Sequence, residues 1–255
     1  MNVGIIGAGA IATYLLEEQE QYEYKITSIF VRHRQKYKHL EKKFGVTLYT
    51  DFQMFLQSRI DIVVEAAGVA AAKQLITQSI TYKDTIIISI GALTDMELLE
   101  QIILLAKRHQ HNLYLPSGAI GGLDLVQNVA TVKTIDNITI ETRKPANTLV
   151  SDELTGEQVV FEGSSAEAIK HFPKNINVGV ILGLAGIGLN ETRVRIVADS
   201  SINKNIHTIT LSGAFGEATF KIQNEPLPTN PKTSYLAAMS IIGILERINN
   251  PIKIG

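Results

Sequence analysis

The chain has 255 residues, of which 45% are hydrophobic and 19% charged, the balance of an ordinary globular protein with one large core or two modest ones. Its 24 basic and 25 acidic side chains leave a net charge of -1. The sequence therefore lacks the excess of basic residues that binding to nucleic acid or an acidic membrane surface requires. Cysteine is absent, which excludes disulfides, thiolate nucleophiles and cysteine-based metal sites.

The first residues enter an apolar run at once. Met1-Asn2 leads directly into Val3-Gly4-Ile5-Ile6, without a basic leader or a small-residue cleavage site, so we expect no secretory signal. The apolar run from Val178 to Leu189 is too short and too rich in glycine to span a bilayer. We therefore expect a cytoplasmic protein that acts on neither membranes nor nucleic acid.

The first half of the chain alternates short β-branched runs with longer amphipathic segments. The predicted strands are Val3–Ile6, Ile26–Val31, Ile62–Glu65, Thr85–Ser89 and Asn112–Leu115. The predicted helices between them are Ile11–Glu20, Gln35–Phe44, Phe52–Gln57, Ala70–Gln78 and Asp95–His109. Because the strands are almost continuously apolar, the pattern predicts an α/β fold of the Rossmann type, a doubly wound parallel sheet covered on both faces.

The pattern of apolar and polar residues changes near Pro116. The later runs alternate as in a sheet with one solvent-exposed face, and they are Asn137–Arg143, Glu157–Glu162, Thr192–Ala198, Asn205–Ser212 and Glu217–Gln223. A proline-rich stretch then precedes a predicted helix, Thr233–Ile248. We expect a dinucleotide-binding domain at residues 1–118, completed by the C-terminal helix at 231–255. The second domain, 119–230, should be α+β with a largely antiparallel sheet and should serve substrate binding and dimerisation.

A glycine-rich turn, Gly7-Ala8-Gly9-Ala10-Ile11-Ala12, follows the first predicted strand and opens the first predicted helix. Gly7 permits a tight turn and Gly9 lets the backbone approach a pyrophosphate, while the helix offers free N–H groups at Ala10 and Ile11. Because the motif lies between a strand and a helix, it predicts that these four residues bind NAD or NADP. The alternative is a plain tight turn in a fold that binds no nucleotide.

The second predicted strand lacks the acidic residue that usually binds the adenosine ribose about 20 residues after the turn. The sequence there reads Ile29-Phe30-Val31-Arg32-His33-Arg34. An arginine at this place can accept a 2′-phosphate, so Arg32 predicts that NADP is at least tolerated. The alternative is that Arg32 stacks on the adenine and does not discriminate between NAD and NADP.

Seven further segments of the sequence resemble the L-aspartate dehydrogenase family. These blocks, together with the glycine turn, extend the resemblance over essentially the whole chain. They are Pro116-Ser-Gly-Ala-Ile-Gly-Gly-Leu-Asp124, Thr142-Arg-Lys-Pro145, Val160-Phe-Glu-Gly163, Phe172-Pro-Lys-Asn-Ile-Asn-Val178, Val197-Ala-Asp199, Asn205-Ile-His207 and Asn230-Pro-Lys-Thr-Ser234.

The resemblance implies a reaction and a set of residues. The reaction is the NAD(P)-dependent oxidation of L-aspartate to iminoaspartate, which supplies de novo NAD biosynthesis, in a homodimer built through the second domain. It also implies that Ala119 and Asn177 contact the cofactor and that His207 is catalytic. Val31 departs from the family, where this position can be Asp, and the departure puts a strict preference for NAD in doubt rather than the reaction.

The chemistry of the residues is consistent with this role. Removing hydride from Cα requires the ammonium to give up a proton, and histidine suits that transfer. By residue type alone, a histidine in a strand is more often structural, so it is the resemblance that selects His207 among six.

Two substrate carboxylates also need fixed cations or donors. Lys174 is the first candidate, although by residue type it could equally be an exposed loop lysine. Thr233 and Ser234 are the others, because they are predicted to open the last helix and to offer hydroxyl and N–H donors.

Two other interpretations stay open. The same fold could act on another substrate, as a homoserine-dehydrogenase-like or dihydrodipicolinate-reductase-like oxidoreductase, or it could be a non-catalytic NADP-sensing protein. A sensor has no need of a proton shuttle, so His207, Lys174 and Asn177 argue against it. No residue pattern suggests a metal site, and hydride transfer to a nicotinamide needs none.

Overall fold

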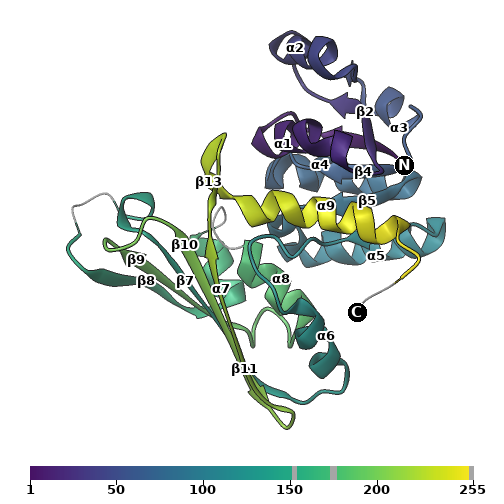
Figure 1. Cartoon of the computed structure of the whole chain (residues 1–255). Coiled ribbons are helices and arrows are strands. Elements are labelled where there is room, and N and C mark those ends of the chain that lie inside the picture. Colours follow the sequence, from purple (N-terminus) through teal and green to yellow (C-terminus); the bar gives the residue numbers. More distant parts are fainter. Residues whose placement is uncertain (151–153, 173–176, 253–255) are drawn as a thin grey trace. The chain divides into compact units, whose positions relative to one another are not determined.

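The computed structural model describes residues 1–150, 154–172 and 177–252, which form two compact units (Figure 1). The first unit consists of Met1–Pro116 together with the residues from Ala238 on, and the second of Ser117–Ala237. Among the described residues, no helix is both long enough and apolar enough to cross a membrane.

The first unit contains a six-stranded sheet whose strands all run parallel, in the order β3-β2-β1-β4-β5-β6. This confirms the predicted doubly wound fold, in which ligands bind beyond the carboxyl ends of the strands, where the connections that leave the neighbouring strands β1 and β4 run in opposite directions. The short strand β3 is absent from the sequence-based prediction, because three residues are too few for a periodic signal. The strands are β1 (Asn2–Ile6), β2 (Lys25–Phe30), β3 (Thr47–Tyr49), β4 (Ile62–Glu65), β5 (Asp84–Ile87) and β6 (Leu113–Tyr114).

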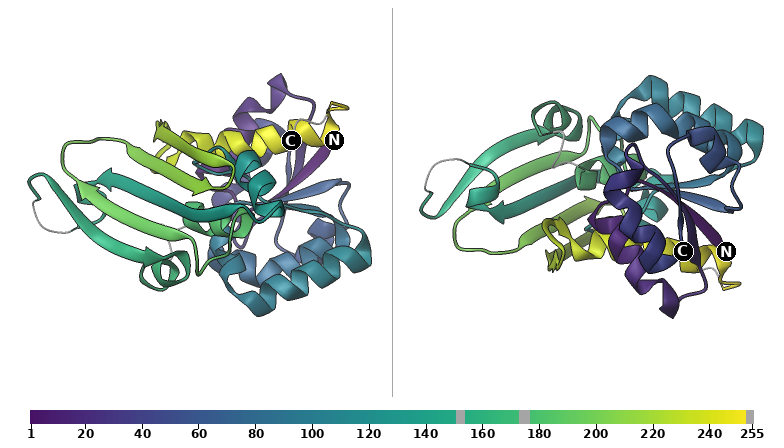
Figure 2. Two further views of the ribbon diagram at one scale, coloured as in Figure 1. Left: turned by 90° about the horizontal axis from the view of Figure 1, so that it is seen from below. Right: turned by 90° about the horizontal axis from the view of Figure 1, so that it is seen from above.

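Helices cover both faces of this sheet. Figure 2 shows α4 and α5 on one face and α1 with the C-terminal helix α9 on the other. The side chain of Asp95 caps α5 by accepting a hydrogen bond from the backbone N–H of Leu98, 3.3 Å away. The helices are α1 (Ala10–Glu18), α2 (Arg34–Phe44), α3 (Phe52–Leu56), α4 (Val69–Tyr82), α5 (Met96–His109) and α9 (Tyr235–Asn249), with short 3-10 turns η1 (Gln19–Gln21) and η2 (Ile90–Thr94).

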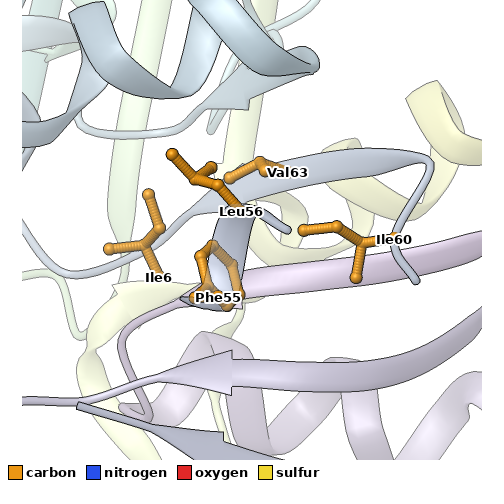
Figure 3. Packing of buried hydrophobic residues seen from close by; sticks show 5 residues of the cluster. All are labelled: Ile6, Phe55, Leu56, Ile60 and Val63. Atoms are coloured by element: carbon orange, nitrogen blue, oxygen red, sulfur yellow. The ribbon is translucent and has the colours of Figure 1, made fainter. Parts of the chain in front are cut away.

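A cluster of fully buried side chains joins the helix α3 to the sheet. Ile6, Phe55, Leu56, Ile60 and Val63 pack together (Figure 3), and the partly buried rings of Phe30, Tyr49 and Phe52 surround them. Gly4 belongs to the same arrangement, since a Cβ there would lie 2.7 Å from Ile60 Cδ1 and 2.8 Å from Phe55 Cζ. The packing holds β1 and β4 in place and thereby fixes the point from which the glycine-rich turn departs.

The second unit is built on a sheet with the order β11-β10-β7-β9-β8. Its pairs are antiparallel except β7 with β9, which run parallel, so the prediction of a largely antiparallel sheet is confirmed. The strands are β7 (Ile135–Pro145), β8 (Glu157–Ser164), β9 (Arg193–Asp199), β10 (Asn205–Gly213) and β11 (Gly216–Asn224), and β12 (Pro226–Leu227) pairs separately with β13 (Asn230–Ser234).

Helices pack against one face of the second sheet, and Figure 1 shows α6 and α8 together on that side. A Cβ on Gly122, the N-cap of α6, would lie 2.6 Å from the ring of Phe220 on β11. A Cβ on Gly186, just past α8, would lie 3.2 Å from Ile138 Cδ1 on β7. The inward face of this sheet is therefore the one that carries Ile138 and Phe220. The helices are α6 (Leu123–Thr131), α7 (Ser165–His171) and α8 (Asn177–Ala185), with a 3-10 turn η3 (Ala146–Thr148).

The C-terminal helix begins later than predicted. Thr233 and Ser234 do not open it: they end β13, where Ser234 pairs with Pro226, and α9 starts at Tyr235. The sequence pattern placed both residues in the helix because they directly precede apolar side chains that recur at helical spacing. The backbone of this segment instead pairs with β12 in a short antiparallel sheet.

Replacing Phe55 with Ala should lower the free energy of unfolding by about 3–5 kcal/mol, because it removes a completely buried ring from the α3 cluster. Urea denaturation followed by circular dichroism measures the change. Met54→Ala is the matched control, because Met54 lies next to Phe55 in the same helix and is 61% exposed, so its effect should stay within about 0.5 kcal/mol. Equal effects of the two variants would contradict the assignment of this core.

Candidate active site

The glycine-rich turn joins β1 to α1 at the carboxyl end of β1, beside the end of its neighbour β4. Gly7 has a φ of 101°, in the region that favours glycine, and its N–H donates to the carbonyl of Phe30 at 2.9 Å. Gly9 is the N-cap of α1, and having no side chain it leaves the first N–H groups of the helix open. The turn thus presents backbone donors and the positive end of a helix dipole, which suits a pyrophosphate.

The two glycines of the turn have different surroundings. A Cβ at Gly7 would lie 2.9 Å from the carbonyl oxygen of Ala66 and 3.0 Å from Ala67. At Gly9, by contrast, nothing among the described residues lies within 4 Å of where a Cβ would stand. Gly7 is therefore required by the protein itself, whereas the bare surface at Gly9 fits the close approach of a dinucleotide.

Glu65, which sequence reasoning did not single out, organises the loop against which this turn packs. It is completely buried at the end of β4, and its carboxylate accepts the backbone N–H groups of Ala67 at 2.8 Å and Gly68 at 3.0 Å. It also accepts the N–H and the hydroxyl of Ser89, each at 3.1 Å. Burial raises the pKa of Glu65, and these four hydrogen bonds oppose that rise.

Two arginines follow β2: Arg32 in the connecting loop and Arg34 as the first residue of α2. Arg34 pairs with Glu41, which lies seven positions later in the same helix, and its Nη2 atom is 2.7 Å from Glu41 Oε1. Arg32 is exposed, and no described residue forms an ion pair with it. Arg32 rather than Arg34 is thus available for a cofactor phosphate, and Val31 beside it is buried.

The second unit holds the candidate catalytic histidine. His207 lies on the inward face of β10, directly opposite Thr142 of β7, and both side chains are only 3% exposed. The hydroxyl Oγ1 of Thr142 lies 3.0 Å from Nδ1 of His207. Because a hydroxyl both donates and accepts, it can partner the ring with or without a proton on Nδ1.

Burial lowers the pKa of His207 to about 4, and the nearby positive charge of Lys144 contributes to the same shift. The imidazole is therefore neutral at neutral pH. When Nδ1 carries the single ring proton and donates it to Thr142, the lone pair lies on Nε2 and can act as a base.

Lys144 lies two positions beyond Thr142 on β7 and so on the same face of the sheet. Burial lowers the pKa of its ammonium group. The inward face thus combines a hydroxyl, an imidazole and an ammonium at one end of β7 and β10. Such a group can bind an anion and accept a proton at the same place.

The predicted cofactor residue Ala119 is tied to this end of the sheet by Asn224. The side chain of Asn224, the last residue of β11, donates from Nδ2 to the carbonyl of Ala119 at 3.0 Å. Asn224 is directly opposite Asn205 of β10, two positions from His207. The glycine-containing segment Pro116–Asp124, to which Ala119 belongs, and His207 are therefore anchored to the same end of one sheet.

A cavity of about 1010 Å³ lies beyond this end of the sheet. Its lining includes Pro145, Asn205, Asn224 and Ser234, with Lys204 and Glu225, which form an ion pair. Ser234 is thus in the wall of this cavity, although on a strand, whereas Thr142, Lys144 and His207 are not among the lining residues. The hydroxyl of Thr233 accepts a hydrogen bond from Asn230 Nδ2 at 3.1 Å.

Two predicted residues remain to be placed. Asn177 is the first residue of α8 and is half-buried, while Lys174 lies outside the described residues. The residues that sequence reasoning missed are Thr142, Lys144, Asn224 and Glu65. Alternation along β7 could have placed Thr142 and Lys144 on one face, but only the pairing of β7 with β10 brings them to His207.

The sequence matches known families and relatives over its whole length. Residues 124–248 match a family model described as "Aspartate dehydrogenase, C-terminal", and residues 3–116 match one described as "Homoserine dehydrogenase, NAD binding domain". The L-aspartate dehydrogenase of Methanococcoides burtonii is 35% identical over 270 residues, which cover 100% of this chain and 99% of that protein. The L-aspartate dehydrogenase of Methanosarcina mazei is 42% identical over 212 residues, 78% of each chain.

Solved structures of dehydrogenases align with this chain as well. The crystal structure of aspartate dehydrogenase from Thermotoga maritima aligns with a TM-score of 0.83 and 36% identity, covering 100% of this chain and 99% of that one. The apo scyllo-inositol dehydrogenase of Lactobacillus casei aligns with a TM-score of 0.57 over 86% of this chain and 75% of that one, at 12% identity, which shows a shared fold alone.

Replacing Gly9 with Ala should weaken NAD(P) binding at least about tenfold, because a methyl group would occupy the space that a pyrophosphate approaches. Fluorescence titration with the reduced dinucleotide measures the affinity. The melting temperature of the free protein should stay unchanged in Gly9→Ala but fall in Gly7→Ala, where the methyl group meets Ala66 and the φ is unfavourable. Unaltered dinucleotide affinity in Gly9→Ala would contradict this site.

Proposed function

The chain belongs to the L-aspartate dehydrogenase family, and we propose that it is an NAD(P)-dependent oxidoreductase that oxidises L-aspartate to iminoaspartate. The observation that carries this proposal is the buried pair of Thr142 and His207 on the inward face of the second sheet. A neutral imidazole beside an ammonium group is suited to an anionic substrate that must lose a proton.

The first task of the site is to bind two carboxylates. Lys144 supplies a half-buried positive charge for one of them, and a lysine held in a poorly hydrated place attracts an anion more strongly than an exposed one. Lys174, Thr233 and Ser234 remain proposed substrate residues, of which Ser234 is supported by its place in the cavity wall.

The second task is to remove a proton from the substrate ammonium. The C=N bond forms from the nitrogen lone pair, so His207 Nε2 must take a proton from nitrogen before hydride leaves Cα. The low pKa of His207 belongs to the free protein, and it keeps the ring unprotonated and ready. Bound carboxylates offset the charge of Lys144 and raise the proton affinity of the ring at the moment when it is needed.

The dinucleotide, when bound, accepts the hydride. Gly7, Gly9, Ala10 and Ile11 would hold its pyrophosphate through backbone N–H groups, and Ala119 with Asn177 would contact its other end. We propose that both NAD and NADP are used, because the exposed Arg32 stands where an acidic residue would otherwise exclude a 2′-phosphate.

The wider setting follows from the family. We propose a cytoplasmic homodimer formed through the second domain, residues 119–230, that supplies de novo NAD biosynthesis. The outward face of the second sheet is the surface that we assign to this interface, because α6 and α8 pack on the other face.

A spectrophotometric screen with NAD and NADP side by side should give reduced cofactor with L-aspartate and not with L-homoserine. His207→Asn should lower kcat about 10²–10⁴-fold while the protein still folds and binds dinucleotide, since Asn keeps a group near Thr142 but has no Nε2. Turnover of homoserine alone would assign another substrate. Dinucleotide binding without turnover of any amino or hydroxy acid would indicate a sensor.

A further inference from the structure

Asn224 carries a polar atom that the protein leaves without a donor. Its side chain is 4% exposed, and its Oδ1 atom is buried and accepts no hydrogen bond from the described residues. Buried acceptors of this kind are rare in folded proteins, and each calls for an explanation such as a ligand.

The orientation of this amide is fixed by its neighbour. The carbonyl of Ala119 can only accept, so the group that faces it at 3.0 Å must be the Nδ2 donor. The Oδ1 atom is then directed away from Ala119. Asn224 lines the cavity beyond the sheet, and its buried Oδ1 atom lies just behind the surface of that wall.

The register of the sheet places this acceptor beside the proposed base. Asn224 is opposite Asn205, and Ile222 is opposite His207, so Asn224 and His207 are diagonal neighbours on the inward face. Diagonal neighbours in an antiparallel pair are about 7–8 Å apart, and one nitrogen atom can hydrogen-bond to groups on both. A substrate nitrogen that gives a proton to His207 therefore lies within reach of Asn224.

We propose that Asn224 Oδ1 accepts an N–H of the amino group of the substrate and thereby selects an amino dicarboxylate. This rests on the proposed function. An ammonium group that has given one proton to His207 keeps two N–H bonds, and one of them can still donate to Asn224. A hydroxy acid has a single O–H proton, and once His207 takes it nothing remains to satisfy Oδ1. Sites built around such a bond discriminate strongly against substrates that lack it.

The test compares two dicarboxylates that differ in the amino group. The affinities of L-aspartate and succinate are measured by calorimetry in the presence of the reduced dinucleotide, so that nothing turns over. The unaltered protein should prefer L-aspartate about tenfold or more, and Asn224→Leu should bring the two affinities to within about threefold while succinate binding is unchanged. Asn224→Asp keeps an acceptor oxygen and should keep the preference.

Gln223→Leu is the matched control, because Gln223 is the adjacent amide of β11 on the exposed face, and it should change neither affinity. The proposal is wrong if both Asn224 variants lose the preference for L-aspartate, because the loss of the hydrogen bond to Ala119 would then be the cause. It is wrong as well if neither variant loses that preference. It is also wrong if Asn224→Leu weakens the dinucleotide instead. If neither dicarboxylate binds the unaltered protein, the proposed function fails as well.

Discussion

The contact between His207 and Thr142 is the interaction on which the chemistry of this protein depends. Burial on the covered face of the second sheet removes the imidazole from water, and the hydroxyl replaces the lost hydrogen bond at Nδ1. Because Lys144 adds a positive charge nearby, the free ring stays neutral. The proton affinity of the base is then set by the charge of what binds, so substrate binding and base strength are coupled.

The two units contribute by different means. In the first, the site is made of backbone: Gly7 and Gly9 form a turn of N–H groups, and the buried carboxylate of Glu65 shapes the adjoining loop through four hydrogen bonds. In the second, the site is made of side chains at one end of β7, β10 and β11. A dinucleotide turn of this kind serves many substrates, so the identity of the substrate must come from the second sheet.

The sequence predicted the fold class, the order of most elements and the glycine turn, because these depend on local periodicity and on a motif with a fixed structural context. It did not reveal Thr142 as the partner of His207. The two residues are 65 positions apart, and β10 pairs with β7 although β8 and β9 lie between them in the chain. Asn224 was missed for the same reason, since its anchor, Ala119, is 105 positions away. Thr233 and Ser234 were misplaced because a short strand runs directly into a helix.

The most direct test of this account is the titration of the His207 imidazole by NMR, with the resonance assigned by its loss in His207→Asn. In the free protein the ring should stay neutral down to a pKa of about 4. Adding succinate with the reduced dinucleotide should raise that pKa, because its two carboxylates offset the charge of Lys144 and it brings no ammonium group to the ring. A ring that titrates near its ordinary value of 6.5 and does not respond to succinate would contradict the account.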